Sequence, residues 1–227
     1  MVDSALAGAL EMVNLDEVPV LTIATGHDEI LNSENLSGFL SLMEDQNFEV
    51  QEIDIMVDEI PEETQILMLP TPNTDYTDEE IQKLRGFVND EEREEALTLL
   101  VTTLPNQAQL PKLAGFLEEW GVAVEPGVVA ETDSSRVAVA NGSYVLVDAS
   151  EDMLEDGNYT RLVAPSSSPL SLLFSGNDGI STQALWTTAD TAYVVTEDTT
   201  QEEAADPETS QQVVASHSYK YVTVGDS

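Results

Sequence analysis

The sequence predicts an α/β fold, with a doubly wound, mostly parallel sheet followed by an irregular β-rich C-terminal part. Three observations support this prediction. Between residues 18 and 125, apolar runs of strand length alternate with amphipathic segments of helical length, which is typical of a parallel sheet. The first run, "VPVLTIAT", is continuously apolar, as expected of a strand buried on both faces. After Gly127 the alternation stops and short strand-like segments follow one another.

The strands of the parallel sheet are predicted from apolar runs bounded by polar or turn-forming residues. They are expected at 18–25, 49–55, 66–69 and 96–103. Right-handed crossovers should connect them. We expect the side chains of Ile23, Ile53, Leu67 and Leu99 to be buried in this sheet.

Helices are predicted where apolar residues recur at helical spacing next to capping residues. Ser33 is the expected N-cap of the first interior helix, and Thr77 with Glu80 forms a capping box for the second. Gly121 follows the third in the usual C′ position. These helices are expected at 33–46, 77–89 and 107–120, after an opening helix at 4–14.

The rest of the chain is predicted to continue the same domain as a β-rich region. A hairpin should turn at Asn141–Gly142, because Asn-Gly favours a tight two-residue turn. The segment "EDTTQEEAADPETSQQ" is acidic and nearly without large apolar side chains, so we expect it to be mobile. The predicted organisation is an α/β domain at 1–135, a β-rich continuation at 136–196, an acidic mobile loop at 197–212 and a truncated terminal strand at 213–227.

The charge of the chain excludes several functions. There are 44 acidic and 7 basic side chains, for a formal net charge of −37, which repels nucleic-acid phosphates and anionic lipid headgroups. Two interpretations remain open: the solvating surface of a halophilic protein, or an acidic extracytoplasmic region. The chain lacks cysteine, which excludes disulfides, a thiolate nucleophile and cysteine-ligated zinc. It also lacks an apolar stretch of the ~20 residues that span a bilayer.

Several phrases of the sequence, taken in order, resemble a known family. They begin with the short helix "SALAGALEMVN" and an apolar strand closed by Thr25-Gly26-His27-Asp28-Glu29. The phrases "LMEDQNFEVQEIDI", Ile60-Pro61, "ILMLPTPNTDYTDEEIQKLRGFV", "LTLLVTT", "LPKLAGFLEEWGVAVEPGVV" and "VTVGDS" follow. Together they are similar to GldG-type auxiliary components of ABC-type transport systems, a family named for a gliding-motility protein and related to an intraflagellar-transport domain. The family's Gly-Gly before the fourth strand is replaced here by "NDEEREEA".

This resemblance implies a soluble domain held outside the cytoplasm. It would work beside the permease and ATPase subunits of an ABC-type transporter, as a fragment of a longer chain anchored in the cell membrane. The resemblance therefore favours a non-enzymatic accessory domain that mediates protein or ligand interaction. The alternative is a hydrolase, or an enzyme binding a small ligand or metal, that uses the Gly26–Glu29 strand edge.

The candidate site consists of Gly26, His27, Asp28 and Glu29 at the end of the first strand. The predicted sheet resembles flavodoxin-like and class I glutamine-amidotransferase-like folds, which bind ligands beyond the carboxyl ends of strands. These four residues could form a structural turn, bind a ligand, or place His27 as a general base oriented by Asp28 or Glu29. Catalysis lacks a nucleophile, since there is neither a cysteine nor a Gly-x-Ser-x-Gly elbow. We therefore predict no catalytic residue and treat the four as tentative ligand-binding residues.

No metal or cofactor is predicted. A zinc site would require the distant His217 to meet His27 together with carboxylates. The acidic runs lack the Asp-x-Asp-x-Asp-Gly spacing of a calcium loop, and the chain has neither a Gly-x-Gly-x-x-Gly motif nor a Walker lysine. The tryptophans at 120 and 186 are interpreted as packing residues.

Overall fold

The structure, a computed structural model, describes residues 18–90, 93, 97–105, 107–139, 142–150 and 161–220. These residues form two compact units. Unit 1 comprises the described residues up to Thr103 together with Gln107–Lys112, and unit 2 comprises Leu104, Pro105 and the described residues from Leu113 onward. The opening helix predicted at 4–14 lies outside the described residues.

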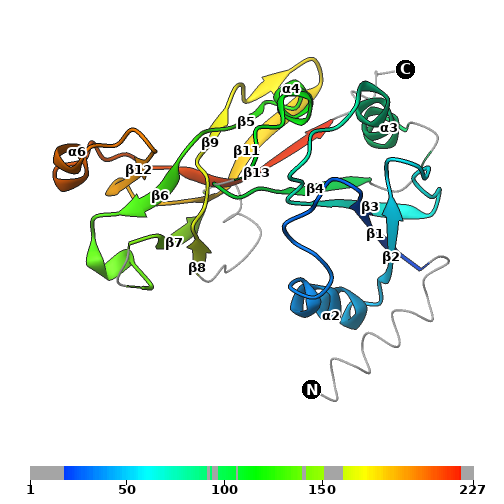
Figure 1. Cartoon of the computed structure of the whole chain (residues 1–227), viewed down its shortest axis with the longest axis horizontal. Coiled ribbons are helices and arrows are strands. Elements are labelled where there is room, and N and C mark those ends of the chain that lie inside the picture. Colours follow the sequence, from blue (N-terminus) through cyan, green and yellow to red (C-terminus); the bar gives the residue numbers. More distant parts are fainter. Residues whose placement is uncertain are drawn as a thin grey trace, which may run out of the picture. The chain divides into compact units, whose positions relative to one another are not determined.

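Unit 1 is built on a four-stranded sheet in the order β2-β1-β3-β4 (Figure 1). Its strands are β1 (Val20–Thr25), β2 (Glu49–Asp54), β3 (Thr64–Pro70) and β4 (Thr98–Thr102). Every pair in this sheet is parallel. The carboxyl ends of β1, β2 and β3 therefore lie at one edge of the sheet, which is where the candidate site lies.

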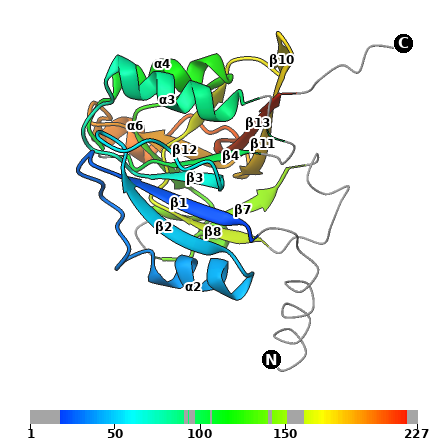
Figure 2. The same ribbon diagram turned by 90° about the vertical axis from the view of Figure 1, so that its right-hand side faces the viewer.

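Two described helices of unit 1, α2 (Ser37–Asp45) and α3 (Asp78–Val88), lie on opposite faces of this sheet (Figure 2). The Thr77/Glu80 capping box predicted for α3 is confirmed. The predicted cap of α2 is wrong, because its N-cap is Leu36 without a side-chain hydrogen bond, while the Ser33 hydroxyl donates to the Glu52 carboxylate.

Three of the four side chains expected in the core of this sheet are buried: Ile23, Ile53 and Leu67. Leu99 is only half-buried, because β4 is an edge strand of the sheet. On the face that α2 covers, Leu21, Ile23, Leu36 and Met68 form a buried cluster.

Unit 2 contains a seven-stranded sheet in the order β5-β9-β13-β11-β7-β8, with β10 beside β11, and a separate pair of β12 and β6. Its pairs are antiparallel. A buried cluster of Val129, Val145, Val147, Ala164 and Ala192 lies at its centre, and Trp186 packs against it, as expected of a packing residue. The strands are β5 (Val122–Val124), β6 (Val128–Glu131), β7 (Tyr144–Ala149), β8 (Leu162–Pro165), β9 (Leu170–Leu172), β10 (Gly176–Asn177), β11 (Ile180–Thr187), β12 (Ala192–Val195) and β13 (Val213–Lys220).

The predicted fold class, a doubly wound and mostly parallel α/β sheet, is wrong. Among the described residues, antiparallel pairing in unit 2 involves more strands than the parallel sheet of unit 1. Parallel neighbours need long crossovers, usually helical, whereas antiparallel neighbours can be joined by short turns. In its described residues, the connection from β6 to β7 contains only the 3₁₀ turn η1 (Ser134–Arg136). The described helices of this part are α4 (Pro111–Glu119) and the five-residue α6 (Gln201–Ala205).

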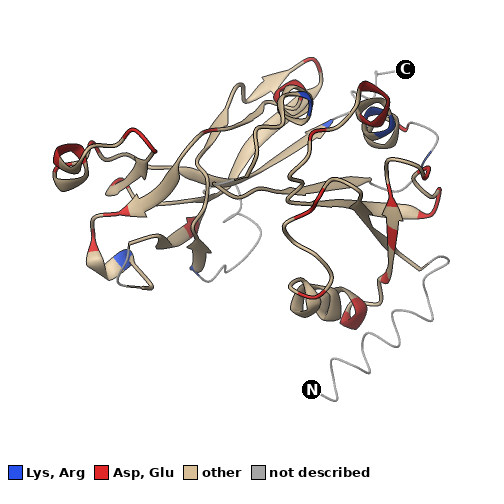
Figure 3. Ribbon diagram, viewed as in Figure 1, with Lys and Arg blue, Asp and Glu red and all other residues tan. Residues whose placement is uncertain are grey.

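Acidic residues are distributed over both units, on strands, helices and loops (Figure 3). The segment 197–212 contains α6, which begins with a capping box formed by Thr200 and Glu203. The mobility of this segment stays a prediction. In the part of the chain that the structure describes, no helix is long and apolar enough to cross a membrane.

Candidate functional site

Gly26 opens a tight turn at the carboxyl end of β1. Its φ is +111°, and a Cβ placed on it would lie 2.6 Å from Asp54 Oδ1 and 3.0 Å from Met56 Cγ. Asp28 also has a positive φ, of +52°. Glycine is therefore needed at position 26, because other residues are strained at this φ and would collide with the end of β2.

The side chain of His27 points into unit 1 and is only 2% exposed. Its ring stacks on that of Tyr76, with centroids 3.9 Å apart and planes inclined by 14°. Its Nε2 atom lies 3.3 Å from Oε2 of Glu80, which is itself buried in the first turn of α3. A substrate can reach this ring only if the turn or α3 moves.

The Gly26–Glu29 turn is also bonded to the loop after β3. The His27 carbonyl accepts hydrogen bonds from the N–H groups of Asn73 and Thr74, at 2.8 and 2.9 Å. The Thr74 hydroxyl donates to Asp28 Oδ2 at 2.8 Å, and the Glu29 carboxylate accepts the His27 N–H at 2.9 Å. Asp28 and Glu29 thus bond the turn itself and its neighbouring loop, and neither orients the His27 ring.

Glu80 and Tyr76 are the site residues that the sequence analysis missed as partners of His27. The sequence identified Glu80 only as part of a helix cap. In the structure its Oε2 atom accepts the Thr77 N–H at 2.6 Å and also faces His27. No local pattern marks the second role, since Glu80 lies 53 residues from His27.

The pKa values of the two partners shift in opposite directions. Burial alone raises the pKa of Glu80, but hydrogen bonds from Thr77 and the nearby His27 outweigh it, so the pKa is lowered. Burial raises the pKa of Tyr76 far above its usual value, and the carboxylates of Glu29 and Glu80 raise it further. Glu80 is therefore an anion and Tyr76 a neutral phenol near neutral pH.

Two buried polar atoms of this cluster have no hydrogen-bond partner among the described residues: His27 Nδ1 and the Tyr76 hydroxyl. His217 belongs to unit 2, where it is exposed on β13 beside Tyr219. Within the described ranges, no group of three or more His, Cys, Asp or Glu side chains could hold a metal ion.

Comparison with known proteins identifies the family. The model of the family described as "ABC-type uncharacterized transport system" matches residues 18–222, which is most of the chain. The chain belongs to this family. The resemblance to auxiliary components of ABC-type transport systems is therefore confirmed. No curated protein matches the chain.

The fold of this family member is similar to that of a solved structure described as "mmIFT52 N-terminal domain". The TM-score is 0.60 and the sequence identity 15%, and the match covers 77% of this chain and 75% of the other. At this identity the likeness concerns the fold alone. It agrees with the relation to an intraflagellar-transport domain that the sequence suggested.

Proposed function

We propose that the chain is a non-enzymatic, extracytoplasmic accessory domain of an ABC-type transport system, of the GldG-like kind, which contacts the permease and ATPase assembly. The observation that carries this proposal is the family match over residues 18–222. In this proposal the full-length protein is anchored in the cell membrane.

The geometry of the Gly26–Glu29 turn supports a non-enzymatic role. A general base must come within hydrogen-bond reach of the proton that it removes. The only histidine in unit 1 is buried against Tyr76 and Glu80, and the chain supplies neither a cysteine nor a nucleophile elbow. In this proposal the turn serves to hold the loops after β1 and β3 together.

The turn after β2 has the properties of a contact surface. Met56 and Val57 are 55% and 74% exposed at the edge of the sheet where the strands end. The Lys83 ammonium holds this turn, since Nζ donates to the carbonyls of Ile55 at 3.2 Å and Asp58 at 2.6 Å. A chain with only 7 basic side chains thus uses one of them to hold a turn that presents two apolar side chains to solvent.

The chemistry around this turn indicates what would bind it. Asp54, Asp58 and Glu59 are exposed next to Met56 and Val57. A complementary partner surface would have an apolar depression surrounded by lysine or arginine side chains. In this proposal that surface belongs to the permease.

Co-purification from membranes tests the proposal. The full-length protein is expressed with the permease and ATPase of its own transport system, and we expect the three to purify as one complex. Val57→Asp should weaken the complex, whereas Leu173→Asp, at an exposed apolar position of unit 2, should leave it intact. Protease added to intact cells should cut the domain if it is extracytoplasmic. A complex that never forms, or hydrolytic turnover by the isolated chain, would contradict the proposal.

A second candidate, small-ligand binding at the Gly26–Glu29 turn, is favoured by one observation. The unpartnered His27 Nδ1 and Tyr76 hydroxyl are both buried beside the carboxyl ends of parallel strands, where ligands commonly bind.

A further inference from the structure

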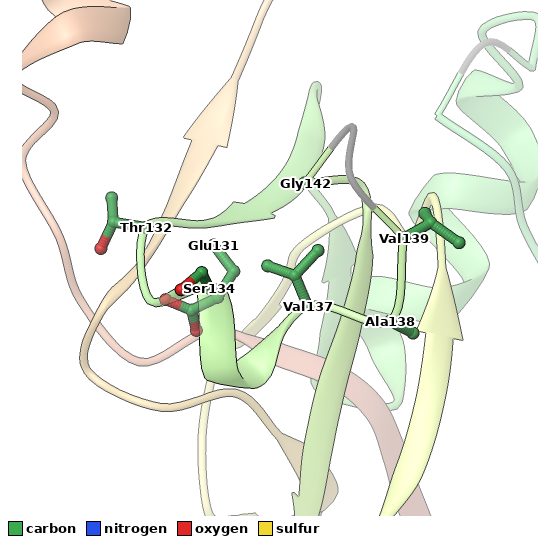
Figure 4. A pocket seen from close by; sticks show the side chains of 7 residues that line it. All are labelled: Glu131, Thr132, Ser134, Val137, Ala138, Val139 and Gly142. Carbon is green, nitrogen blue, oxygen red and sulfur yellow. The ribbon is translucent and has the colours of Figure 1, made fainter.

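Unit 2 contains a cavity of about 280 Å³ between the end of β6 and the segment that leads to β7 (Figure 4). The side chains of Glu131, Thr132 and Ser134 line one part of it. Val137, Ala138 and Val139 line another part. Figure 4 shows Glu131 beside Ser134, with Val137 between them and the Ala138–Val139 segment. We call this cavity the Glu131 pocket.

The carboxylate of Glu131 is buried but only half satisfied. The residue is 6% exposed, and its Oε1 atom accepts the N–H of Asp133 at 2.9 Å. Its Oε2 atom is buried without a hydrogen-bond partner among the described residues. Buried carboxylate oxygens are almost always paired, because an unpaired buried charge is strongly unfavourable. This oxygen therefore needs a donor.

Two arginines of unit 2, Arg136 and Arg161, do not pair with Glu131. Arg136 follows Glu131 closely in sequence, but its Nη2 donates to the carboxylate of Asp148, and its buried Nε has no partner among the described residues. Arg161 donates to the other oxygen of the same carboxylate at 2.7 Å. The donor that Glu131 lacks is thus not supplied by either arginine.

The backbone around Glu131 is held firmly. Glu131 lies opposite Ala192 in the β6–β12 pair, and both the N–H and the hydroxyl of Thr132 donate to the Thr191 carbonyl. The Asp133 carboxylate accepts the Ser135 N–H at 2.8 Å and caps the turn that follows. The backbone would therefore not have to be ordered by a ligand, which would reach the buried Oε2 atom once the Glu131 side chain turns toward the pocket.

The lining of the pocket selects the class of ligand. A lone carboxylate oxygen requires a hydrogen-bond donor, and a cationic donor gives the strongest pairing. No cluster of metal-ligating side chains exists within the described residues, so the pocket suits an organic cation better than a metal ion. The apolar side chains of Val137, Ala138 and Val139 provide a surface for a short aliphatic stem.

We propose that the Glu131 pocket binds an alkylammonium group, as carried by a lysine side chain. The ammonium donates to Oε2 of Glu131, and its methylene groups pack against the valine and alanine side chains of the opposite wall. Among the described residues, a Cβ added to Gly142 at the rim of the pocket would meet only the Glu131 carbonyl oxygen, at 3.9 Å. This binding is independent of the contact with the permease proposed above.

Calorimetry with small probes tests this proposal on the whole chain. Nα-acetyl-lysine amide is titrated in about 0.3 M NaCl, which screens the exposed carboxylates more than a buried one. We expect saturable binding at one site. The same compound acetylated on Nε should not bind, because it has lost the charge. n-Butylammonium carries the ammonium and an alkyl stem without the peptide groups, so its binding shows whether the pocket takes a free amine as well as a lysine side chain. Absence of saturable binding by both cations would overturn the proposal.

Variants separate a binding role of Glu131 from a structural one. Glu131→Gln should weaken binding about 10-fold to 100-fold, as expected for loss of a charge-assisted hydrogen bond. The melting temperature of the unliganded protein should stay equal or rise, because glutamine can still accept from Asp133 while the buried charge is gone. Glu125→Gln removes an exposed carboxylate of the same unit and should change neither property.

A second variant keeps the test decisive if Glu131→Gln folds poorly. Ala138→Phe fills the pocket from an exposed wall position and leaves Glu131 in place, so it should also abolish binding. Binding that persists unchanged in Glu131→Gln or in Ala138→Phe would overturn the proposal. A large fall in the melting temperature of Glu131→Gln, together with undiminished binding by Ala138→Phe, would also overturn the proposal.

Discussion

Among the described residues, each unit buries one glutamate, and the two glutamates differ in how completely they are paired. Glu80 in unit 1 is 4% exposed, and its Oε2 atom faces both the Thr77 N–H and His27 Nε2. Glu131 in unit 2 is 6% exposed, and its Oε2 atom has no partner among the described residues. Burial is nearly equal, so burial alone does not distinguish a structural carboxylate from one suited to bind a ligand. The satisfied hydrogen bonds make that distinction.

Two glycines, Gly26 in unit 1 and Gly142 in unit 2, differ in the same way. Gly26 has a positive φ and is closely surrounded, with Asp54 Oδ1 2.6 Å from the position of an added Cβ. Gly142 also has a positive φ, of +78°, but among the described residues an added Cβ would meet only one atom within 4 Å. Gly26 is therefore closely packed, whereas Gly142 has few described neighbours.

Matched alanine substitutions at these glycines should give the largest contrast. Gly26→Ala should destabilise unit 1 by about 2–6 kcal/mol, from about 1–3 kcal/mol of backbone strain and a similar overpacking cost. Asp54 cannot move away freely, because its Oδ1 accepts the Met56 N–H at 3.1 Å. Gly142→Ala should cost only about 1–2 kcal/mol of strain. Urea unfolding of both variants measures the difference, and equal costs would contradict the contrast in packing.

Removal of the Glu80 carboxylate should have the next largest effect. We expect Glu80→Ala to cost about 2–4 kcal/mol of unfolding free energy, from about 1 kcal/mol for the lost cap and 1–3 kcal/mol for the unpaired His27 nitrogen. Glu79→Ala, at the exposed neighbouring position of the same helix turn, is the matched control. If the two variants unfold at the same urea concentration, the Glu80–His27 contact contributes nothing to stability.

The sequence predicted unit 1 better than unit 2 for a physical reason. The strands of unit 1 are apolar runs separated by helices, and both patterns are local in the sequence. In unit 2, β5 pairs with β9 and β13 pairs with β11, so strands far apart in sequence become neighbours. Short strands do not encode those neighbours locally, so the sequence predicted an irregular β-rich part there and not its antiparallel sheet.

The sequence predicted where the Gly26–Glu29 turn lies along the fold, but not the contacts that its residues make. The Gly26–Glu29 turn ends a buried strand, as the apolar run "VPVLTIAT" indicated. The burial of His27 depends on Tyr76 and Glu80, which come from the region after β3. Glu131 follows the apolar run Val128–Ala130, and nothing in its local pattern distinguishes a buried carboxylate from one at an exposed strand end.

The paired state of Glu80 should also appear in the pH dependence of stability. Its pKa is lower in the folded state than the usual value of about 4.3. The stabilisation is therefore present above that value and is lost as the pH falls through the folded pKa. We expect the difference in unfolding free energy between the wild type and Glu80→Gln to shrink in this acidic window. The titration of the other carboxylates affects the unfolding free energy of both proteins equally, so it cancels in this difference. A difference that stays constant across the acidic window would contradict an ionised Glu80.

The smallest effect is expected for Tyr76→Phe, and it decides how far the contrast between the units extends. The Tyr76 ring is needed to stack on His27, but its buried hydroxyl has no partner among the described residues. Removal of an unpaired buried hydroxyl should change the unfolding free energy by less than about 0.5 kcal/mol, or raise it slightly.

A loss above about 1 kcal/mol would mean that the hydroxyl is hydrogen-bonded in solution, to a buried water or a bound ligand. Repeating the measurement on protein refolded from denaturant and freed of small molecules separates these two cases, because only a ligand is removed by that treatment. A ligand-dependent loss would make the Gly26–Glu29 turn a binding site, and unit 1 would then resemble unit 2 in binding a ligand through an incompletely paired buried group.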